Sequence, residues 1–160
     1  MTSAPKAQYS TETPAVKQKK KEIPWGESRI LVAGCQGQIG VPLVRALCKE
    51  LGPENVIATD VAEQKFDFPC RYESLDVCDD DKYSKLVKDN KINYIVHLAG
   101  ILSALGERHP DLAIDVNVLG VVNVMRIAQK MDCRIFLPSS IAVFGGDLFP
   151  KRKTPVDVIL

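Results

Sequence analysis

Hydrophobic and polar residues follow two alternating patterns from residue 29 onward. Short hydrophobic runs predict strands at residues 29–33, 55–59, 71–75, 93–98 and 134–138. Between them, helical spacing predicts helices from Gln38 to Leu51, from Asp79 to Asn90 and from about Pro110 to Met131. The recurring hydrophobic positions of the last helix are Leu112, Val116, Leu119, Val122, Ile127 and Met131. Because strands that alternate with helices are typical of βαβ units, we expect an α/β fold with a doubly wound parallel sheet, ordered 3-2-1-4-5.

Residues 1–28 lack this periodicity and are rich in Ser, Thr, Lys and Pro. We expect them to form a largely disordered tail, mobile up to about residue 26. The alternative is a mitochondrial presequence, since the segment is positively charged and hydroxyl-rich; that reading favours mitochondria over the cytoplasm. Against it, the segment has no Arg before Arg29, contains Glu12, and has a basic run at residues 19–21 that is not arranged as an amphipathic helix.

The composition favours one globular domain, here residues 29–160, without a highly charged partner. The chain has 160 residues, 46% of them hydrophobic and 26% charged, with a net charge of +1. This charge gives no reason to expect nucleic acid or an anionic membrane as partner, and no apolar run reaches the 18 residues that span a bilayer. The five cysteines are odd in number and form no C-x-x-C pair, which argues against a disulfide framework or a metal site and favours a reducing compartment.

Three glycines follow the first predicted strand in the pattern Gly34-x-x-Gly37-x-x-Gly40. A turn of this kind between a strand and a helix is typical of dinucleotide binding. Gly34 permits the tight turn, Gly37 lets the backbone approach a pyrophosphate, and Gly40 lets the helix pack against the strand. The amides at the N-terminus of the helix then face the phosphates. A glycine-rich turn that binds nothing is the alternative.

Two aspartates follow the next two strands. Asp60 ends the second strand, 20 residues after Gly40, where a carboxylate can accept hydrogen bonds from the adenosine ribose and repel a 2′-phosphate; this favours NAD over NADP. Asp76 follows the third strand and is expected near the adenine. Either aspartate could instead cap a following helix.

Six motifs together resemble the extended short-chain dehydrogenase/reductase superfamily: GCQGQIG (34–40), Asp60, LDV (75–77), HLAG (97–100), VNVLG (116–120) and PSSIAVFG (138–145). Within it, the runs HLAGILSALGE (97–107) and PSSIAVFGG (138–146) are most similar to the short-chain L-threonine 3-dehydrogenases, whereas sugar-nucleotide epimerases usually have Tyr at the position of Phe144. The resemblance covers residues 29–155. It implies a Rossmann-type fold, NAD as cofactor, L-threonine as small-molecule substrate and a homodimer in the full-length form.

The resemblance also implies roles for particular residues. Those expected at the NAD site are Gly34, Gly37, Gln38, Ile39, Gly40, Asp60, Asp76, Val77, Leu98, Ala99, Gly100 and Asn117. The catalytic hydroxyl that orients the substrate alcohol is Ser140, and the residues expected to contact the substrate are Ser139 and Ser103. The alternatives are a cap or turn for the serine pair, a loop serine for Ser103 and a surface helix position for Asn117. We expect His97 to be a buried packing residue rather than a catalytic one.

The superfamily's acid/base pair, Tyr-x-x-x-Lys, is missing from residues 1–160, because none of the tyrosines (Tyr9, Tyr72, Tyr83, Tyr94) precedes a lysine by four positions. The sixth strand and the substrate domain of such enzymes are missing too, so we expect a sheet incomplete at its C-terminal side, with an open edge at the fifth strand. The sequence thus resembles the N-terminal portion of a threonine dehydrogenase, as a fragment, an isoform or a decayed copy, inactive by itself. A sugar-nucleotide epimerase or dehydratase and a non-catalytic NAD-binding remnant are the alternatives.

Overall fold

The sheet of this protein is parallel and has the predicted order. The computed structural model describes residues 23–140. In this part of the chain, five parallel strands are arranged in the order β3-β2-β1-β4-β5, a Rossmann-like topology. Their bounds are β1 (Ile30–Ala33), β2 (Val56–Asp60), β3 (Arg71–Ser74), β4 (Tyr94–His97) and β5 (Arg134–Phe136). β1 lies at the centre, and β3 and β5 lie at the two edges of the described sheet.

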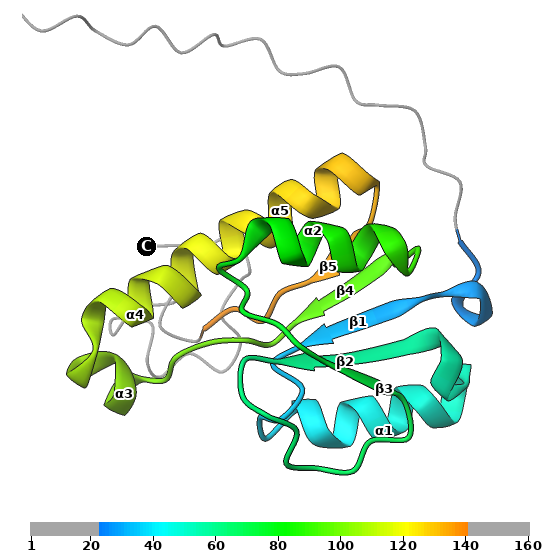
Figure 1. Cartoon of the computed structure of the whole chain (residues 1–160), viewed down its shortest axis with the longest axis horizontal. Helices are drawn as coiled ribbons and strands as arrows, with labels where there is room; N and C mark the ends of the chain where they lie inside the picture. Colours follow the sequence, from blue (N-terminus) through cyan, green and yellow to red (C-terminus); the bar gives the residue numbers. More distant parts are fainter. Residues whose placement is uncertain (1–22, 141–160) are drawn as a thin grey trace, which may run out of the picture.

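Helices cover both faces of this sheet (Figure 1). α1 (Gly40–Leu51) lies on one face, and α2 (Asp80–Asp89) and α5 (Gly120–Met131) lie on the other. Shorter helical segments connect them: the 3₁₀ helices η1 (Trp25–Glu27) and η2 (Pro53–Asn55), the helices α3 (Ser103–Arg108) and α4 (Pro110–Ile114), and the π-helix η3 (Asp115–Leu119). The crossovers from β1 to β2, from β3 to β4 and from β4 to β5 each place a helix on a face of the sheet, so the central strands are buried between two helical layers.

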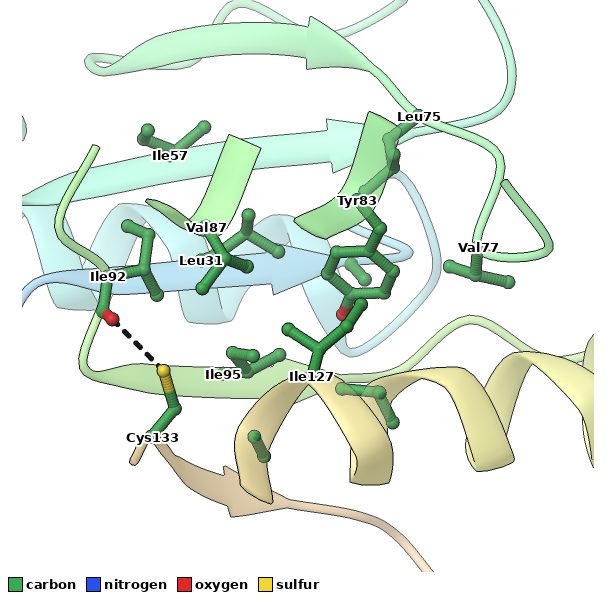
Figure 2. Close-up of a cluster of buried hydrophobic side chains, with 13 residues drawn as sticks. Leu31, Ile57, Leu75, Val77, Tyr83, Val87, Ile92, Ile95, Ile127 and Cys133 are labelled. Atoms are coloured by element: carbon green, nitrogen blue, oxygen red, sulfur yellow. Dashed lines mark hydrogen bonds between the residues drawn. The ribbon is translucent and has the colours of Figure 1, made fainter. Parts of the chain in front are cut away.

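The central strand shows how the sequence builds the two cores. All four residues of β1 are buried, as expected for a strand covered on both faces. Ile30 and Val32 pack with the hydrophobic residues of α1. Leu31 and Ala33 pack with those of α2 and α5, and Figure 2 shows this second cluster. The two-residue period of the strand thus sends alternate side chains into separate cores.

The predicted helix from Pro110 to Met131 is interrupted. It consists of α4, the π-helix η3 and α5, and only α5 contributes fully buried residues among the three. Leu112 and Leu119, predicted from the helical spacing, are 44% and 49% exposed. A π turn holds one more residue than an α turn, so the helical spacing of α5 does not continue back into α4.

Smaller differences concern element ends. α1 begins at Gly40 and not at Gln38, because Gln38 and Ile39 belong to the glycine turn. α2 begins at Asp80, after Asp79, whose side chain caps it. β5 ends at Phe136 rather than at residue 138, and the short helix α3 has no counterpart in the prediction.

The folded part begins before Arg29, whereas the sequence predicts a tail up to residue 28. Residues 23–28 include the helix η1, and its Trp25 ring meets the Tyr94 ring edge-on at 6.2 Å between centroids. Ser28 is buried. The carbonyls of Glu27 and Ile23 also accept hydrogen bonds from Asn93 and Arg134, so this ring contact and these hydrogen bonds hold the stretch against the sheet. Residues 1–22 lie outside the described residues. Across residues 23–140, no helix combines the length and the apolar character needed to cross a bilayer.

Candidate functional site: a pocket at the carboxyl ends of the strands

The glycine turn joins β1 to α1 through close backbone packing. Gly34 has a φ of 80°, and the N–H groups of Gly34 and Cys35 both donate to the carbonyl of Thr59 on β2, at 2.9 and 3.0 Å. A Cβ added to Gly40 would overlap the carbonyl oxygens of Gly34 and Cys35. A Cβ added to Gly37 would meet nothing closer than 3.5 Å. Gly34 and Gly40 are therefore required by the protein's own packing, while a Cβ at Gly37 would make only an ordinary contact with the carbonyl oxygen of Gly34.

Asp60 ends β2 beside this turn. Its carboxylate accepts the backbone N–H of Gln36 at 3.0 Å and that of Ala62 at 3.3 Å. No helix follows, so the alternative that Asp60 is a helix N-cap is wrong. Each carboxylate oxygen receives one hydrogen bond from the protein here, and a carboxylate has about four acceptor sites, so Asp60 has capacity for ligand hydroxyls.

A pocket of about 760 Å³ opens at this edge of the sheet. It is formed by the segments that follow the carboxyl ends of β1, β2, β3 and β4, together with residues of α3, α4 and η3. Its lining residues are Gly34, Gln36, Gly37, Asp60, Val61, Ala62, Lys65, Phe66, Leu75, Asp76, Val77, Leu98, Ala99, Gly100, Ile101, Leu105, Leu112 and Val116. In doubly wound sheets, ligands bind at the carboxyl ends of the strands, where the strand order reverses.

Eight of the residues predicted at the NAD site line this pocket: Gly34, Gly37, Asp60, Asp76, Val77, Leu98, Ala99 and Gly100. Four predicted residues, Gln38, Ile39, Gly40 and Asn117, do not line it. Gln38 and Ile39 are exposed in the turn, and Gly40 is buried beneath it. The sequence did not single out the loop residues Lys65 and Phe66, because nothing in their spacing links them to the glycine turn.

Asp76 accepts the backbone N–H of Cys78 at 2.9 Å. The cap of α2 is Asp79, which accepts the N–H of Lys82 at 2.9 Å. The alternative that Asp76 caps this helix is therefore wrong. The same short turn brings Asp76 and Val77 to the pocket wall.

Asn117 lies on the π-helix η3 and binds the backbone of Ile101. Its Oδ1 accepts the N–H of Ile101 at 2.8 Å, and its Nδ2 donates to the carbonyl of Ile101 at 3.0 Å. Asn117 is neither a simple surface residue nor a lining residue of the pocket. It anchors the segment after β4, in which Leu98, Ala99 and Gly100 line the pocket.

His97 lies in the core and not at the site. It is 2% exposed and its ring stacks on that of Tyr83 at 6.5 Å between centroids. Burial lowers the pKa of the imidazole to about 4. Neither ring nitrogen has a hydrogen-bond partner within the described residues. His97 is thus a neutral packing residue, as expected, but one whose polar atoms are unsatisfied.

Cys35, within the glycine turn, is buried, and burial together with the nearby Asp60 charge raises the pKa of its thiol to about 12. A thiol that stays protonated is a poor nucleophile. In the described part of the chain, no group of three or more His, Cys, Asp or Glu side chains could hold a metal ion.

Of the three predicted substrate serines, Ser139 and Ser140 are not among the described residues that line the pocket. Ser103 begins α3, between the lining residues Ile101 and Leu105. Ser139 and Ser140 follow β5, and both are exposed. Their assigned roles remain predictions.

Comparison with known proteins gives the same picture. The profile of the NAD dependent epimerase/dehydratase family matches residues 30–157. An uncharacterised epimerase/dehydratase of Staphylococcus aureus (strain USA300) is 41% identical over 131 residues, which cover 79% of this chain and 40% of that protein. The chain therefore spans about two fifths of the length of the curated relatives it matches.

Two solved structures are similar over most of the chain. A monomeric L-threonine 3-dehydrogenase from a metagenome is 46% identical, with a TM-score of 0.69, and the match covers 74% of this chain and 38% of that one. An L-threonine dehydrogenase from Clostridium difficile is 38% identical, with a TM-score of 0.75, and the match covers 82% of this chain and 42% of the Clostridium difficile chain. With the family profile matched across the whole sheet and the glycine turn, the chain belongs to the NAD dependent epimerase/dehydratase family.

Proposed function

We propose that this chain is the NAD-binding part of a dehydrogenase that oxidises L-threonine to 2-amino-3-oxobutyrate. The observation that carries the proposal is the pocket between the glycine turn and Asp60, in a chain that is 46% identical to an L-threonine 3-dehydrogenase over 74% of its length. The family supports an NAD-dependent oxidoreductase. L-threonine as the substrate rests on the resemblance and on the names of these structural neighbours.

The residues of the pocket fit NAD. Gly37 is exposed and lines the pocket where a pyrophosphate would approach, and no side chain caps the N-terminus of α1 beside it. Asp60 has acceptor capacity for the adenosine ribose. Asp76 and Val77 lie where an adenine would rest, and Leu98, Ala99 and Gly100 lie along the other side of the pocket. NAD bound here supplies a hydride acceptor for the carbinol carbon of the substrate.

Ser140 is proposed to hold the substrate alcohol, with Ser139 and Ser103 in contact with the rest of the substrate. Support comes from the match of residues 138–145 to the family motif and from the position of the serine pair after β5, at the edge of the sheet where such folds bind ligands. A hydroxyl there can orient the alcohol for hydride loss, which a carbon side chain cannot do.

Removal of the alcohol proton requires a general base, and residues 1–160 contain no Tyr-x-x-x-Lys. The proposal therefore requires a base from residues that are not in this sequence. A tyrosine whose pKa is lowered by a lysine one helical turn away would perform this step.

The test uses the product of the complete coding sequence, provided it carries a Tyr-x-x-x-Lys in frame after Leu160. We expect NADH formation with L-threonine and none with a uridine diphosphate sugar. Ser140→Ala should lower kcat by about 10²-fold or more while leaving NAD affinity unchanged, and Ser139→Ala, the matched control, should do less. A coding sequence without that motif, or a Ser140→Ala protein that melts earlier but turns over normally, would contradict the assignment.

A second candidate is a sugar-nucleotide epimerase or dehydratase. It is favoured by the description of the Staphylococcus aureus relatives as epimerase/dehydratase proteins. The discriminating result is conversion of a uridine diphosphate sugar without net NADH formation.

A further inference from the structure

The connection between β2 and β3, residues 61–70, contains neither helix nor strand. Its shape cannot come from regular backbone hydrogen bonding, so its polar backbone groups need partners elsewhere. Four of its residues, Val61, Ala62, Lys65 and Phe66, form one wall of the pocket. What holds residues 61–66 therefore also shapes the pocket.

Gln36, in the glycine turn, supplies two of these partners. Its Oε1 accepts the backbone N–H of Lys65 at 2.6 Å, and its Nε2 donates to the carbonyl of Glu63 at 3.0 Å. Its own backbone N–H donates to the carboxylate of Asp60 at 3.0 Å. Gln36 thus links the glycine turn to Asp60 and to residues 61–66.

Tyr72, on β3, completes the network. Its hydroxyl donates to the carbonyl of Ala62 and lies 3.4 Å from the Nε2 of Gln36. Burial raises the pKa of this phenol to about 12, so the hydroxyl keeps its proton and remains a donor. The ring stacks nearly parallel to that of Phe68, at 6.4 Å between centroids. The hydrogen bonds hold the Tyr72 hydroxyl, and the stacking on Phe68 holds its ring.

We propose that Gln36 is a positioning residue for the adenosine half of NAD: through its amide it holds residues 61–66 as a preformed wall beside Asp60. This inference rests on the NAD site proposed above. A loop that is already ordered loses less conformational freedom when the ligand binds, so the network raises the affinity without a contact to the reacting atoms. The nicotinamide half, expected on the side of Leu98, Ala99 and Gly100, does not depend on it.

The experiment uses the full chain and Gln36→Met, which keeps the length of the side chain and removes both amide hydrogen bonds to the loop. Isothermal titration gives the affinity for NAD, and ligand-observed NMR gives those for adenosine monophosphate and nicotinamide mononucleotide. The control is Gln129→Met, the same substitution at an exposed position of α5. We expect Gln36→Met to weaken NAD and adenosine monophosphate binding about tenfold, because residues 61–66 would then have to be ordered when the ligand binds. Nicotinamide mononucleotide binding should stay within twofold of the wild-type value.

A second variant covers the case in which Gln36→Met does not fold. Tyr72→Phe keeps the ring stacked on Phe68 and removes only the hydroxyl. It should weaken adenosine monophosphate binding by a smaller factor than Gln36→Met does, and leave the affinity for nicotinamide mononucleotide unchanged. The inference is overturned if the affinity for adenosine monophosphate is unchanged in the folded variants. It is also overturned if the binding of adenosine monophosphate and that of nicotinamide mononucleotide weaken equally. Wild-type protein that binds no NAD at all would instead reject the cofactor site itself.

Discussion

Gly34 and Ala99 pack backbone against backbone: a Cβ added to Gly34 would lie 2.6 Å from the amide nitrogen of Ala99. Gly34 also has a φ of 80°, a conformation that side chains disfavour. The turn after β1 is thereby fixed to the end of β4, which brings two walls of the pocket together. Gly37, which lines the pocket, lies three residues further along the same turn.

Substitution of the two glycines should separate folding from binding. Gly34→Ala should lower the free energy of unfolding by about 2 kcal/mol or more, because it combines strain and overlap. Gly37→Ala should keep the wild-type melting temperature within a few degrees and lose NAD affinity, since its methyl group would occupy the space of the pyrophosphate. Denaturant unfolding and NAD titration of both variants check this. Normal NAD binding by a folded Gly37→Ala protein would show that the pyrophosphate does not approach there.

Tyr83→Phe should stabilise the protein. The Tyr83 hydroxyl is buried within the cluster of Figure 2 and has no hydrogen-bond partner among residues 23–140. An unsatisfied buried hydroxyl costs about 1–3 kcal/mol, so we expect a gain of about 1 kcal/mol in urea unfolding. The control is Tyr94→Phe on β4, for which the change should be within about 0.5 kcal/mol. A loss of stability in Tyr83→Phe would mean that the hydroxyl has a partner.

Stability should fall in mild acid because of His97. The folded protein keeps His97 neutral until its pKa of about 4, whereas the unfolded chain binds that proton below about 6.5. The unfolded state therefore takes up the proton first as the pH falls. The free energy of unfolding decreases by about 3 kcal/mol between the two pKa values, and His97 causes no further decrease below the lower one. Above pH 6.5, His97 is neutral in both states and its full contribution to the free energy of unfolding is retained.

The measurement is urea unfolding as a function of pH for three proteins. His97→Leu should show a shallower pH dependence than the wild type between these limits. His109→Gln, a change at the other of the two histidines, which is exposed, should retain the wild-type slope. Equal slopes in all three proteins would show that His97 is protonated as readily in the folded state as in the unfolded one.

The strands and the first glycine turn could be predicted because each depends on local pattern. The complete burial of β1 and the φ of Gly34 follow from a hydrophobic run followed by glycine. The interruption of the long helix could not be predicted, since the hydrophobic spacing from Leu112 to Met131 fits a continuous α-helix equally well. Residues 23–28 are held by a ring contact with Tyr94 and by hydrogen bonds from Asn93 and Arg134, which no local signal marks.

The same distinction applies to the site. Asp60 and Asp76 were predicted near the cofactor from their positions after strands, and both line the pocket. Gln36 was an unspecified position within the glycine pattern, and its partners lie 27 and 29 positions away along the chain. Asn117 was assigned by resemblance to the NAD site, whereas its side chain binds the Ile101 backbone. Tertiary hydrogen bonds of this kind leave no periodic signal in a single sequence.

The central claim is that NAD binds this pocket with its adenosine ribose on Asp60. The direct measurement is calorimetric titration of the full chain and of Asp60→Asn with NAD and NADP. The asparagine keeps one carbonyl oxygen, which can accept the Gln36 amide, and loses only the longer hydrogen bond from Ala62, so the fold should be retained while the charge is removed. The account predicts that the wild type binds NAD more tightly than NADP. Asp60→Asn should lower the affinity for NAD about tenfold or more and reduce the ratio of the NAD affinity to the NADP affinity. Equal wild-type affinities for the two dinucleotides, or an unchanged preference in Asp60→Asn, would contradict it.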